Sequence, residues 1–125
     1  MDVDRVILLL TSASPQDLFR FYRDTLGLPE VFDSGPGEGL PGGAVRVGGA
    51  VLVIEGHSET QGAAMEPQRH FMDFHVRDVY SEQARLQTQG VRFIRPAERE
   101  AWGGIIATFL DPDGNFLQLV QEPRT

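Results

Sequence analysis

The chain has 125 residues, 41% hydrophobic and 23% charged, a balance typical of one folded domain and unlike that of a disordered segment. Its 18 acidic and 11 basic residues give a net charge of −7, which argues against nucleic acid or an anionic membrane surface as a partner. The absence of cysteine excludes disulfides and thiolate chemistry. The apolar run at residues 6–10 is too short to span a membrane, so we expect a cytoplasmic protein.

The first half of the chain predicts a strand, a helix and three further strands. Residues 5–11 form a β-branched and leucine-rich run that is typical of a strand buried on both faces. Ser14 is placed to cap a helix with Pro15 at its first position, and Gly27 is placed to end that helix. The remaining strands are predicted at residues 28–33, 45–47 and 50–55, the last two joined as a hairpin.

The same order of elements returns after a polar segment, residues 57–69, which we interpret as a linker. A strand is predicted from His70 to Arg77, Asp78 then caps a helix over residues 79–89, and Gly90 ends that helix. The remaining strands are predicted at residues 91–95, where Pro96 ends the strand, 105–110 and 116–121.

The spacing of these signals indicates an internal repeat. The caps Ser14 and Asp78 lie 64 residues apart (78 − 14), and the helix-ending Gly27 and Gly90 lie 63 apart (90 − 27). Two modules, residues 1–56 and 70–125, each ordered strand–helix–strand–strand–strand, explain both offsets. Neither module could bury its sheet face alone, so we expect both to pack as a single α+β domain.

Two segments resemble a known family. FYRDTLGL at residues 21–28 is similar to that family's FYRDxLGL, and FLDPDGNFLQL at residues 109–119 is similar to its F-x-DPDGNxxEL. The family is the vicinal oxygen chelate superfamily, which includes glyoxalase I, extradiol dioxygenases and the bleomycin- and fosfomycin-resistance proteins. The resemblance implies tandem βαβββ modules that form a cupped mixed sheet with the helices outside. It specifies the activity poorly, because one fold hosts many functions here.

In the metal-dependent members, His, Gln or Glu side chains on the first and last strands of each module hold a divalent metal. The metal chelates neighbouring substrate oxygens and acts as a Lewis acid. Carried over to this chain, these positions are Ile7, Phe71, Gln118 and either Glu55 or Val53. Ile7 and Phe71 have no lone pair, and the two remaining donors do not make a stable site. We therefore expect no cofactor.

The strand at residues 70–77 places Phe71, Asp73 and His75 on one face, because side chains alternate with a period of 2. A carboxylate beside an imidazole stabilises its protonated form, which suits a general base or an anion-binding cation. The same pattern also fits hydrogen-bonded core residues. If the strand ends converge, Asp73 and His75 would join Glu55 and His57 in a relocated zinc or manganese site.

Three further features have two readings each. Gln118, flanked by Phe116, is either an amide contact to a ligand or a satisfied core group. Trp102 is either a stacking wall over an apolar ligand or a plug in the core or a subunit interface. Residues 111–115, with Glu122, imitate a calcium loop, but they lack the glycine at the sixth position and the flanking helices, so a hairpin turn is predicted.

These observations predict a protein that binds a small organic molecule in the cupped sheet without the family metal, like the drug-sequestering members. The alternatives are a metal-dependent lyase, isomerase or dioxygenase, acid/base chemistry through His75, and a sheet-edge interaction partner with no ligand. No catalytic residue is assigned. An unpaired apolar sheet edge also predicts a homodimer, in which the partner subunit completes the cavity. The predicted ligand contacts are Phe71, Asp73, His75, Phe116, Gln118, Glu55 and Trp102.

Overall fold

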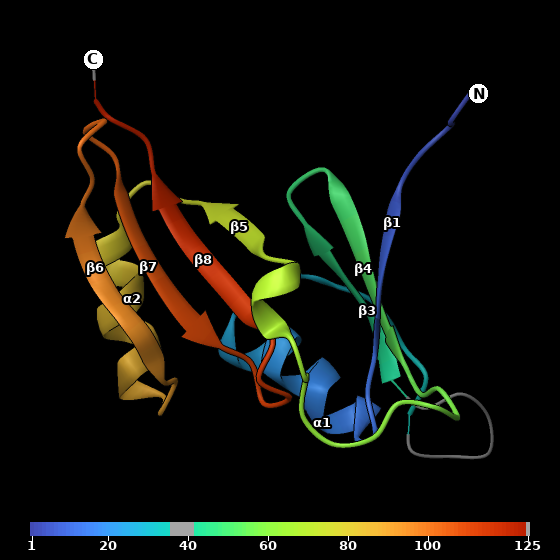
Figure 1. Cartoon of the computed structure of the whole chain (residues 1–125). Coiled ribbons are helices and arrows are strands. Elements are labelled where there is room, and N and C mark those ends of the chain that lie inside the picture. Colours follow the sequence, from blue (N-terminus) through green and yellow to red (C-terminus); the bar gives the residue numbers. More distant parts are fainter. Residues whose placement is uncertain (36–41, 125) are drawn as a thin grey trace. The chain divides into compact units, whose positions relative to one another are not determined.

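Two four-stranded sheets form the framework of the protein (Figure 1). The computed structural model describes residues 1–35 and 42–124, and the chain divides into two compact units, Met1–Gly62 and Ala63–Thr125. None of the described helices is long and apolar enough to cross a membrane. The elements of the first unit are β1 (Ile7–Thr11), α1 (Pro15–Arg20), the π-helical turn η1 (Phe21–Thr25), β2 (Glu30–Asp33), β3 (Gly42–Val47) and β4 (Ala50–Glu55). Those of the second are the 3₁₀ turn η2 (Pro67–Arg69), β5 (Met72–His75), α2 (Val79–Thr88), β6 (Phe93–Arg99), β7 (Ile105–Leu110) and β8 (Phe116–Gln121).

The two sheets have the same strand order. The first is ordered β1-β4-β3-β2 and the second β5-β8-β7-β6. In each sheet the first strand pairs in parallel with the last, and the other pairs are antiparallel. This shared topology confirms the predicted duplication of a βαβββ module and the α+β fold class.

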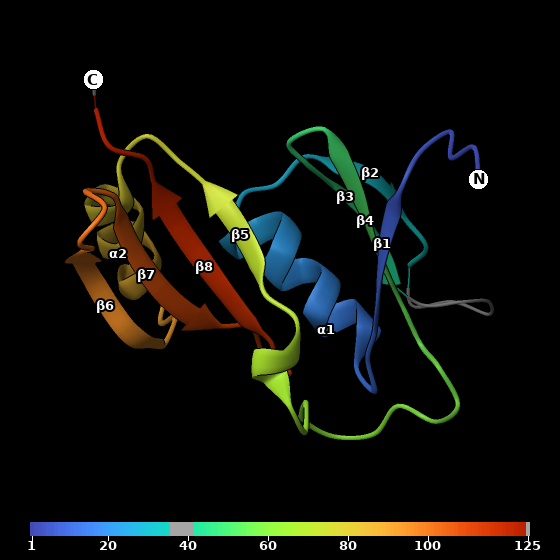
Figure 2. The ribbon, with the colours of Figure 1, turned by 45° about the horizontal axis from the view of Figure 1, so that its top comes forward.

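The core of the first unit lies between α1 and one face of its sheet (Figure 2). Leu18, Phe19 and Tyr22 are fully buried, at helical spacing on one side of the helical segment. Gly43 in β3 makes this packing possible, because a Cβ atom there would lie 2.6 Å from Cε1 of Phe19. The glycine is therefore a packing requirement of the α1–β3 contact.

Arg23 connects the π-helical turn to β2. Its guanidinium donates to Asp24 at 2.7 Å, Glu30 at 2.9 Å and Asp33 at 3.0 Å, and its Cζ lies 4.8 Å from the ring centroid of Phe19. The backbone N–H of Gly35 and the side chains of Gln16 and Arg23 lower the pKa of Asp33. The arginine of the FYRD segment therefore has a structural role.

The predicted helix ends are confirmed, but only one predicted cap forms. Gly27 and Gly90 follow their helices with φ of 76° and 85°. The Asp78 carboxylate accepts from the backbone N–H of Ser81 at 3.1 Å and caps α2. Ser14 makes no capping hydrogen bond with its side chain. Its own N–H donates to the Ser12 hydroxyl, and it is this local contact that organises the turn into α1.

In the second unit α2 packs on β6, β7 and β8 (Figure 1). Val79 and Leu86 are the buried residues of the helix, and Phe109 and Leu117 face them from the sheet with no exposed surface. The Phe93 and Phe109 rings lie 5.3 Å apart and join β6 to β7. This packing buries one face of the second sheet under α2, and the side chains of the opposite face point away from that helix.

Two strand predictions need correction. The strand expected to end before Pro96 runs on to Arg99. Proline has no backbone N–H to pair, but β6 is the edge strand and its pairing with β7 shifts between Arg95 and Glu98, which accommodates the ring. The strand expected to be buried on both faces, β1, is also an edge strand, and Ile7 and Leu9 remain 45% and 54% exposed.

Candidate functional site

The far face, by which we mean the face of the second sheet opposite α2, carries five of the seven predicted ligand contacts. Its residues alternate along the strands with the buried residues that pack under α2. Its exposure is greatest at β5, whereas Thr108 and Val120 are only 5% exposed. The members of the far face are Phe71, Asp73 and His75 at β5, Phe116, Gln118 and Val120 on β8, and Ile106, Thr108 and Leu110 on β7.

The strand register arranges these side chains in rows across the sheet. Asp73 lies opposite Gln118, and Gln118 lies opposite Thr108, which forms a polar row. On one side of this row His75 pairs with Val120, and on the other side Leu110 pairs with Phe116. The polar row therefore lies between apolar or aromatic neighbours, which is the pattern of small-molecule sites.

Phe71 and Phe116 form an aromatic pair beside the polar row. Their ring centroids lie 5.4 Å apart with an interplanar angle of 81°, an edge-to-face contact. Phe71 remains 41% exposed, so much of its ring is available to another molecule. This pair provides an apolar surface suited to a flat ring.

The side chains of Asp73 and Gln118 are not engaged by the rest of the protein. Within residues 1–35 and 42–124, neither makes a side-chain hydrogen bond or ion pair. An ionised carboxylate offers only acceptors, whereas a glutamine amide offers both donors and acceptors. The two together can bind a group that carries N–H or O–H donors.

The carboxylate partner of His75 is Glu122 and not the expected neighbour Asp73. His75 Nδ1 lies 3.3 Å from Glu122 Oε1, and both side chains are more than half exposed. Glu122 follows β8 directly, two residues after Val120, which is the register partner of His75. The contact is therefore a consequence of the parallel β5–β8 pairing, a relation that the sequence does not reveal.

The other two predicted contacts do not belong to the strand rows of the far face. Glu55 ends β4 in the first unit, opposite Thr11 of β1, and so belongs to a different sheet. Trp102 lies in the β6–β7 turn, 53% exposed, and its ring fills the place that a Cβ atom on Gly104 would occupy. Gly104 lies two residues before Ile106, so by strand alternation its Cβ direction points to the far face. The indole that occupies this direction therefore lies over the end of the far face.

The donor set does not fit the family metal. The two positions on β1 and just before β5 hold Ile7 and Phe71, which have no donor atoms. Glu55 and Gln118 are the remaining candidates, fewer than the three protein ligands of an open metal site. In the described part of the chain, no three His, Asp or Glu side chains group closely enough to hold a metal ion.

The segment that imitates a calcium loop is a hairpin turn between β7 and β8. The Asp111 carboxylate is 4% exposed and accepts hydrogen bonds from the backbone N–H groups of Asp113 and Asn115, each at 2.9 Å. The Asn115 amide donates to its other oxygen at 2.8 Å. The carboxylate is used by the turn, as the sequence predicted.

A family model described as the Glyoxalase/Bleomycin resistance protein/Dioxygenase superfamily matches residues 5–119. A solved member of this superfamily from Sphaerobacter thermophilus DSM 20745 is 24% identical, with 94% of this chain and 98% of that chain covered and a TM-score of 0.69. TnmS3, an antibiotic binding protein from Streptomyces sp. CB03234, is 25% identical, with 98% of each chain covered and a TM-score of 0.74. A protein of unknown function from Agrobacterium tumefaciens str. C58 is 24% identical, with 98% and 96% covered and a TM-score of 0.73.

The search of curated proteins found no match. The family model nevertheless covers nearly the whole chain, and both sheets have the topology of the repeated module. The chain therefore belongs to the Glyoxalase/Bleomycin resistance protein/Dioxygenase superfamily.

Proposed function

We propose that this protein binds a small organic ligand on the far face of its second sheet, without a metal. The observation that carries this proposal is the Phe71–Phe116 pair beside the unengaged Asp73 and Gln118 side chains. Apolar walls with a few oriented polar groups are the usual lining of small-molecule sites. A flat ring would lie against the phenylalanines while its polar substituents meet the polar row.

The polar row indicates the chemistry of the ligand. Asp73 only accepts hydrogen bonds when ionised, so it favours an amine or a hydroxyl on the ligand. An ammonium would gain in addition from the negative charge of the protein, which is −7 overall. We therefore expect a planar, partly aromatic molecule with an amine next to its ring system.

The donor set of this chain supports binding without a metal. Ile7 and Phe71 offer no lone pair at the positions that the family uses, and Glu55 and Gln118 alone are too few. The name of TnmS3, an antibiotic binding protein 25% identical to this chain, supports sequestration of a ligand as the function. The alternative, a metal-dependent lyase, isomerase or dioxygenase, requires donors that the family positions lack.

We also infer that the protein is a homodimer. β1 is an edge strand, and Ile7, Leu8 and Leu9 on it are 45%, 39% and 54% exposed. An apolar edge strand with unpaired backbone groups is a template for association. Sedimentation is expected to show a dimer, and a monomer at micromolar concentration would contradict this inference.

Calorimetry with 9-aminoacridine, a planar cation at neutral pH, tests the ligand proposal, and acridine, largely uncharged there, is the matched probe. We expect 9-aminoacridine to bind more tightly, and Asp73→Asn to weaken its binding about tenfold, as expected for loss of one charge-assisted hydrogen bond. Phe71→Ala should weaken both probes. Asp2→Asn, a change of the same charge in the N-terminal segment, is the control and should leave both affinities unchanged.

Three results would contradict the proposal. One is the absence of saturable binding of either probe, and another is an unchanged 9-aminoacridine affinity in Asp73→Asn. The third is a near-stoichiometric divalent metal in protein purified without chelator, which would favour the enzymatic alternative.

A further inference from the structure

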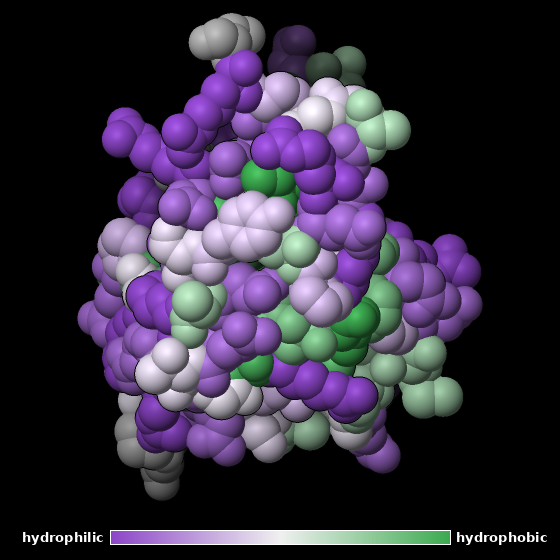
Figure 3. All heavy atoms as spheres, turned by 90° about the vertical axis from the view of Figure 1, so that its left-hand side faces the viewer, coloured by the Kyte–Doolittle hydropathy of each residue, from purple (hydrophilic) through white to green (hydrophobic). Residues whose placement is uncertain are grey.

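A hollow of about 500 Å³ lies in the second unit where α2 begins, between the β6–β7 turn and the segment that follows β8. Ile105, Tyr80 and Pro123 provide apolar surface in it, and Arg99 and Arg124 are its cationic groups. Ile105 belongs to the row of β7 that faces α2, so this hollow is separate from the far face. Figure 3 views the molecule from the side of β6 and α2, where hydrophilic residues predominate around smaller apolar patches.

The two arginines of the hollow are not held in ion pairs with carboxylates of residues 1–35 and 42–124. All 11 basic residues are arginine. Five of them pair with carboxylates, namely Arg20, Arg23, Arg69, Arg85 and Arg95. Within the described residues Arg99 and Arg124 form no ion pair, although Arg99 donates to the carbonyl of Gly103 at 3.1 Å. Arg5, Arg46, Arg77 and Arg92 form no ion pair in the described part of the chain either, but of these six arginines it is Arg99 and Arg124 that line this hollow.

The carboxylates that also line the hollow are engaged elsewhere. Asp78 accepts from the N–H of Ser81, and hydrogen bonds from Ser81 lower the pKa of this carboxyl, with a smaller contribution from the charge of Arg124. Glu122 lies 3.3 Å from His75 Nδ1 on the other side of the chain segment. The Val79 N–H at the start of α2 already donates to Gln121. The helix terminus is therefore satisfied, and Arg99 and Arg124 are the groups of this hollow that can meet an anion.

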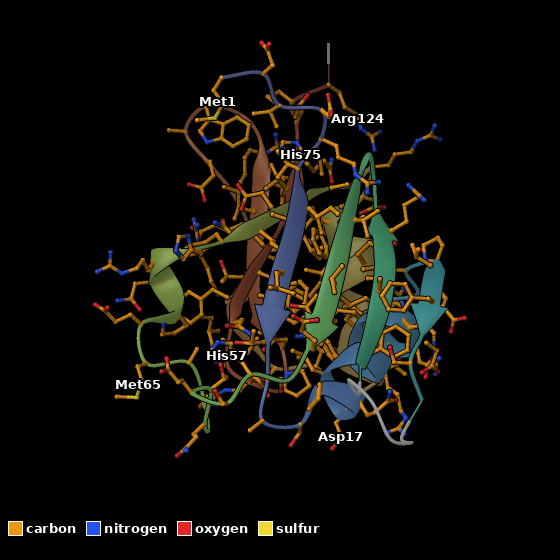
Figure 4. All side chains as sticks on the ribbon, turned by 90° about the vertical axis from the view of Figure 1, so that its right-hand side faces the viewer. Met1, Asp17, His57, Met65, His75 and Arg124 are labelled. Carbon is orange, nitrogen blue, oxygen red and sulfur yellow. The ribbon has the colours of Figure 1, made fainter. Side chains whose placement is uncertain are left out.

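A second hollow of about 510 Å³ adjoins the first and adds Arg77 to the cationic groups. The two hollows share Gln121, Glu122 and Arg124, so Arg124 is accessible from both sides of the C-terminal segment. Figure 4 shows Arg124 and His75 at the same end of the protein. A third guanidinium at this end adds to the positive potential around the first hollow.

We propose that the first hollow is a second binding site, for a small organic acid whose carboxylate lies between Arg99 and Arg124. Guanidinium groups bind carboxylates through parallel, charge-assisted hydrogen bonds. The apolar body of the acid would lie against Tyr80, Ile105 and Pro123, surface that an inorganic anion would not use. This site is distinct from the far face and takes a ligand of the opposite charge.

Titration of the ¹⁵N-labelled protein with benzoate tests the proposal, with uncharged benzamide as the matched probe. We expect benzoate to give saturable amide shifts around Tyr80 and Ile105, and benzamide to give none that saturate in the same range. Arg124→Gln should weaken benzoate binding about tenfold, since one charge-assisted contact is lost. Arg99→Gln should weaken it to a similar extent. If Arg99→Gln fails to fold, Arg124→Gln still tests the proposal, because Arg124 is exposed.

Arg92→Gln is the control, because Arg92 is exposed, has no carboxylate partner among the described residues and does not line either hollow. Asp73→Asn should leave benzoate binding unchanged, which separates this site from the one on the far face. Equal binding of benzamide, or unchanged binding in Arg124→Gln, would refute the carboxylate contact. Inorganic phosphate that binds as tightly as benzoate would refute the organic acid, because it would show that the apolar wall contributes nothing.

Discussion

The Asp111→Ala substitution is expected to destabilise the protein strongly, because the Asp111 carboxylate organises the β7–β8 turn. At least three donors converge on it, among them the N–H groups of Asp113 and Asn115 at 2.9 Å and the Asn115 amide at 2.8 Å. With only 4% of Asp111 exposed, water has little access to these donors in the folded state. Removing the acceptor leaves them without a partner unless the turn opens.

The magnitude follows from the number of bonds lost. At about 1 kcal/mol net for each of three hydrogen bonds, the free energy of unfolding should fall by about 3 kcal/mol, or roughly 10 °C in melting temperature for a domain of this size. Asp111→Asn retains an acceptor oxygen for the two backbone N–H groups. Its new NH₂ group, however, would face the NH₂ group of Asn115, so that two donors meet without an acceptor. This variant should lose about 1 kcal/mol.

Urea unfolding followed by fluorescence measures this effect, because Trp102 is the only tryptophan of the chain and lies in the same unit as the turn. A loss below about 0.5 kcal/mol in Asp111→Ala would refute the structural role of the carboxylate. Calcium provides the second check. If calcium raised the unfolding midpoint of the unmodified protein but not of Asp111→Ala, the segment would be an ion site and the hairpin interpretation would be wrong.

Two further predictions concern the helices. Gly43→Ala should lower the free energy of unfolding by about 1–3 kcal/mol, because a Cβ atom there would overlap Phe19 and the carbonyl of Phe32. Gly49→Ala is the control and should change the free energy of unfolding little, because a Cβ atom there would meet nothing within 4 Å. Equal effects of the two substitutions would refute the packing argument. Asp78→Asn tests the cap of α2: hydrogen bonds from Ser81 lower the pKa of Asp78 below its usual 3.8, so the ionised carboxylate stabilises the folded state above about pH 4. The difference in urea midpoint between the unmodified protein and Asp78→Asn should therefore be largest at pH 7 and shrink as the pH falls below 4. A difference that stays constant with pH would contradict the role of the Asp78 carboxylate as the cap of α2.

The local features of the fold could be predicted because each has a local cause. Gly27 and Gly90 adopt positive φ after their helices, and Asp78 caps α2 through a residue three positions away. The alternation over β5 likewise predicts correctly which of its side chains face away from α2. Pro96 was misread because its tolerance depends on β6 being an edge strand, a property of the whole sheet.

The candidate site was only partly predictable for the same reason. The sequence places Asp73 and His75 on one face, but the partner of His75 is Glu122, which reaches it through the parallel β5–β8 register. Thr108 beside Gln118 was missed, although the alternation of β7 carried the signal. The arginine-lined hollow depends on three segments distant in sequence, so no local pattern indicates it.

The internal repeat itself shows which residues folding does not require. The offset of 64 residues between the modules aligns Leu9 with Asp73, and the pair Leu9–Val53 in the first sheet corresponds to Asp73–Gln118 in the second. Both sheets keep apolar residues at the positions that pack under a helix, because burial there stabilises each module. On the opposite face the first sheet has the apolar pair Leu9–Val53, and the strands pair there in the same way. The polar pair of the other copy therefore has no necessary role in forming the sheet, and the ligand that we propose, with matching donors, would give it one.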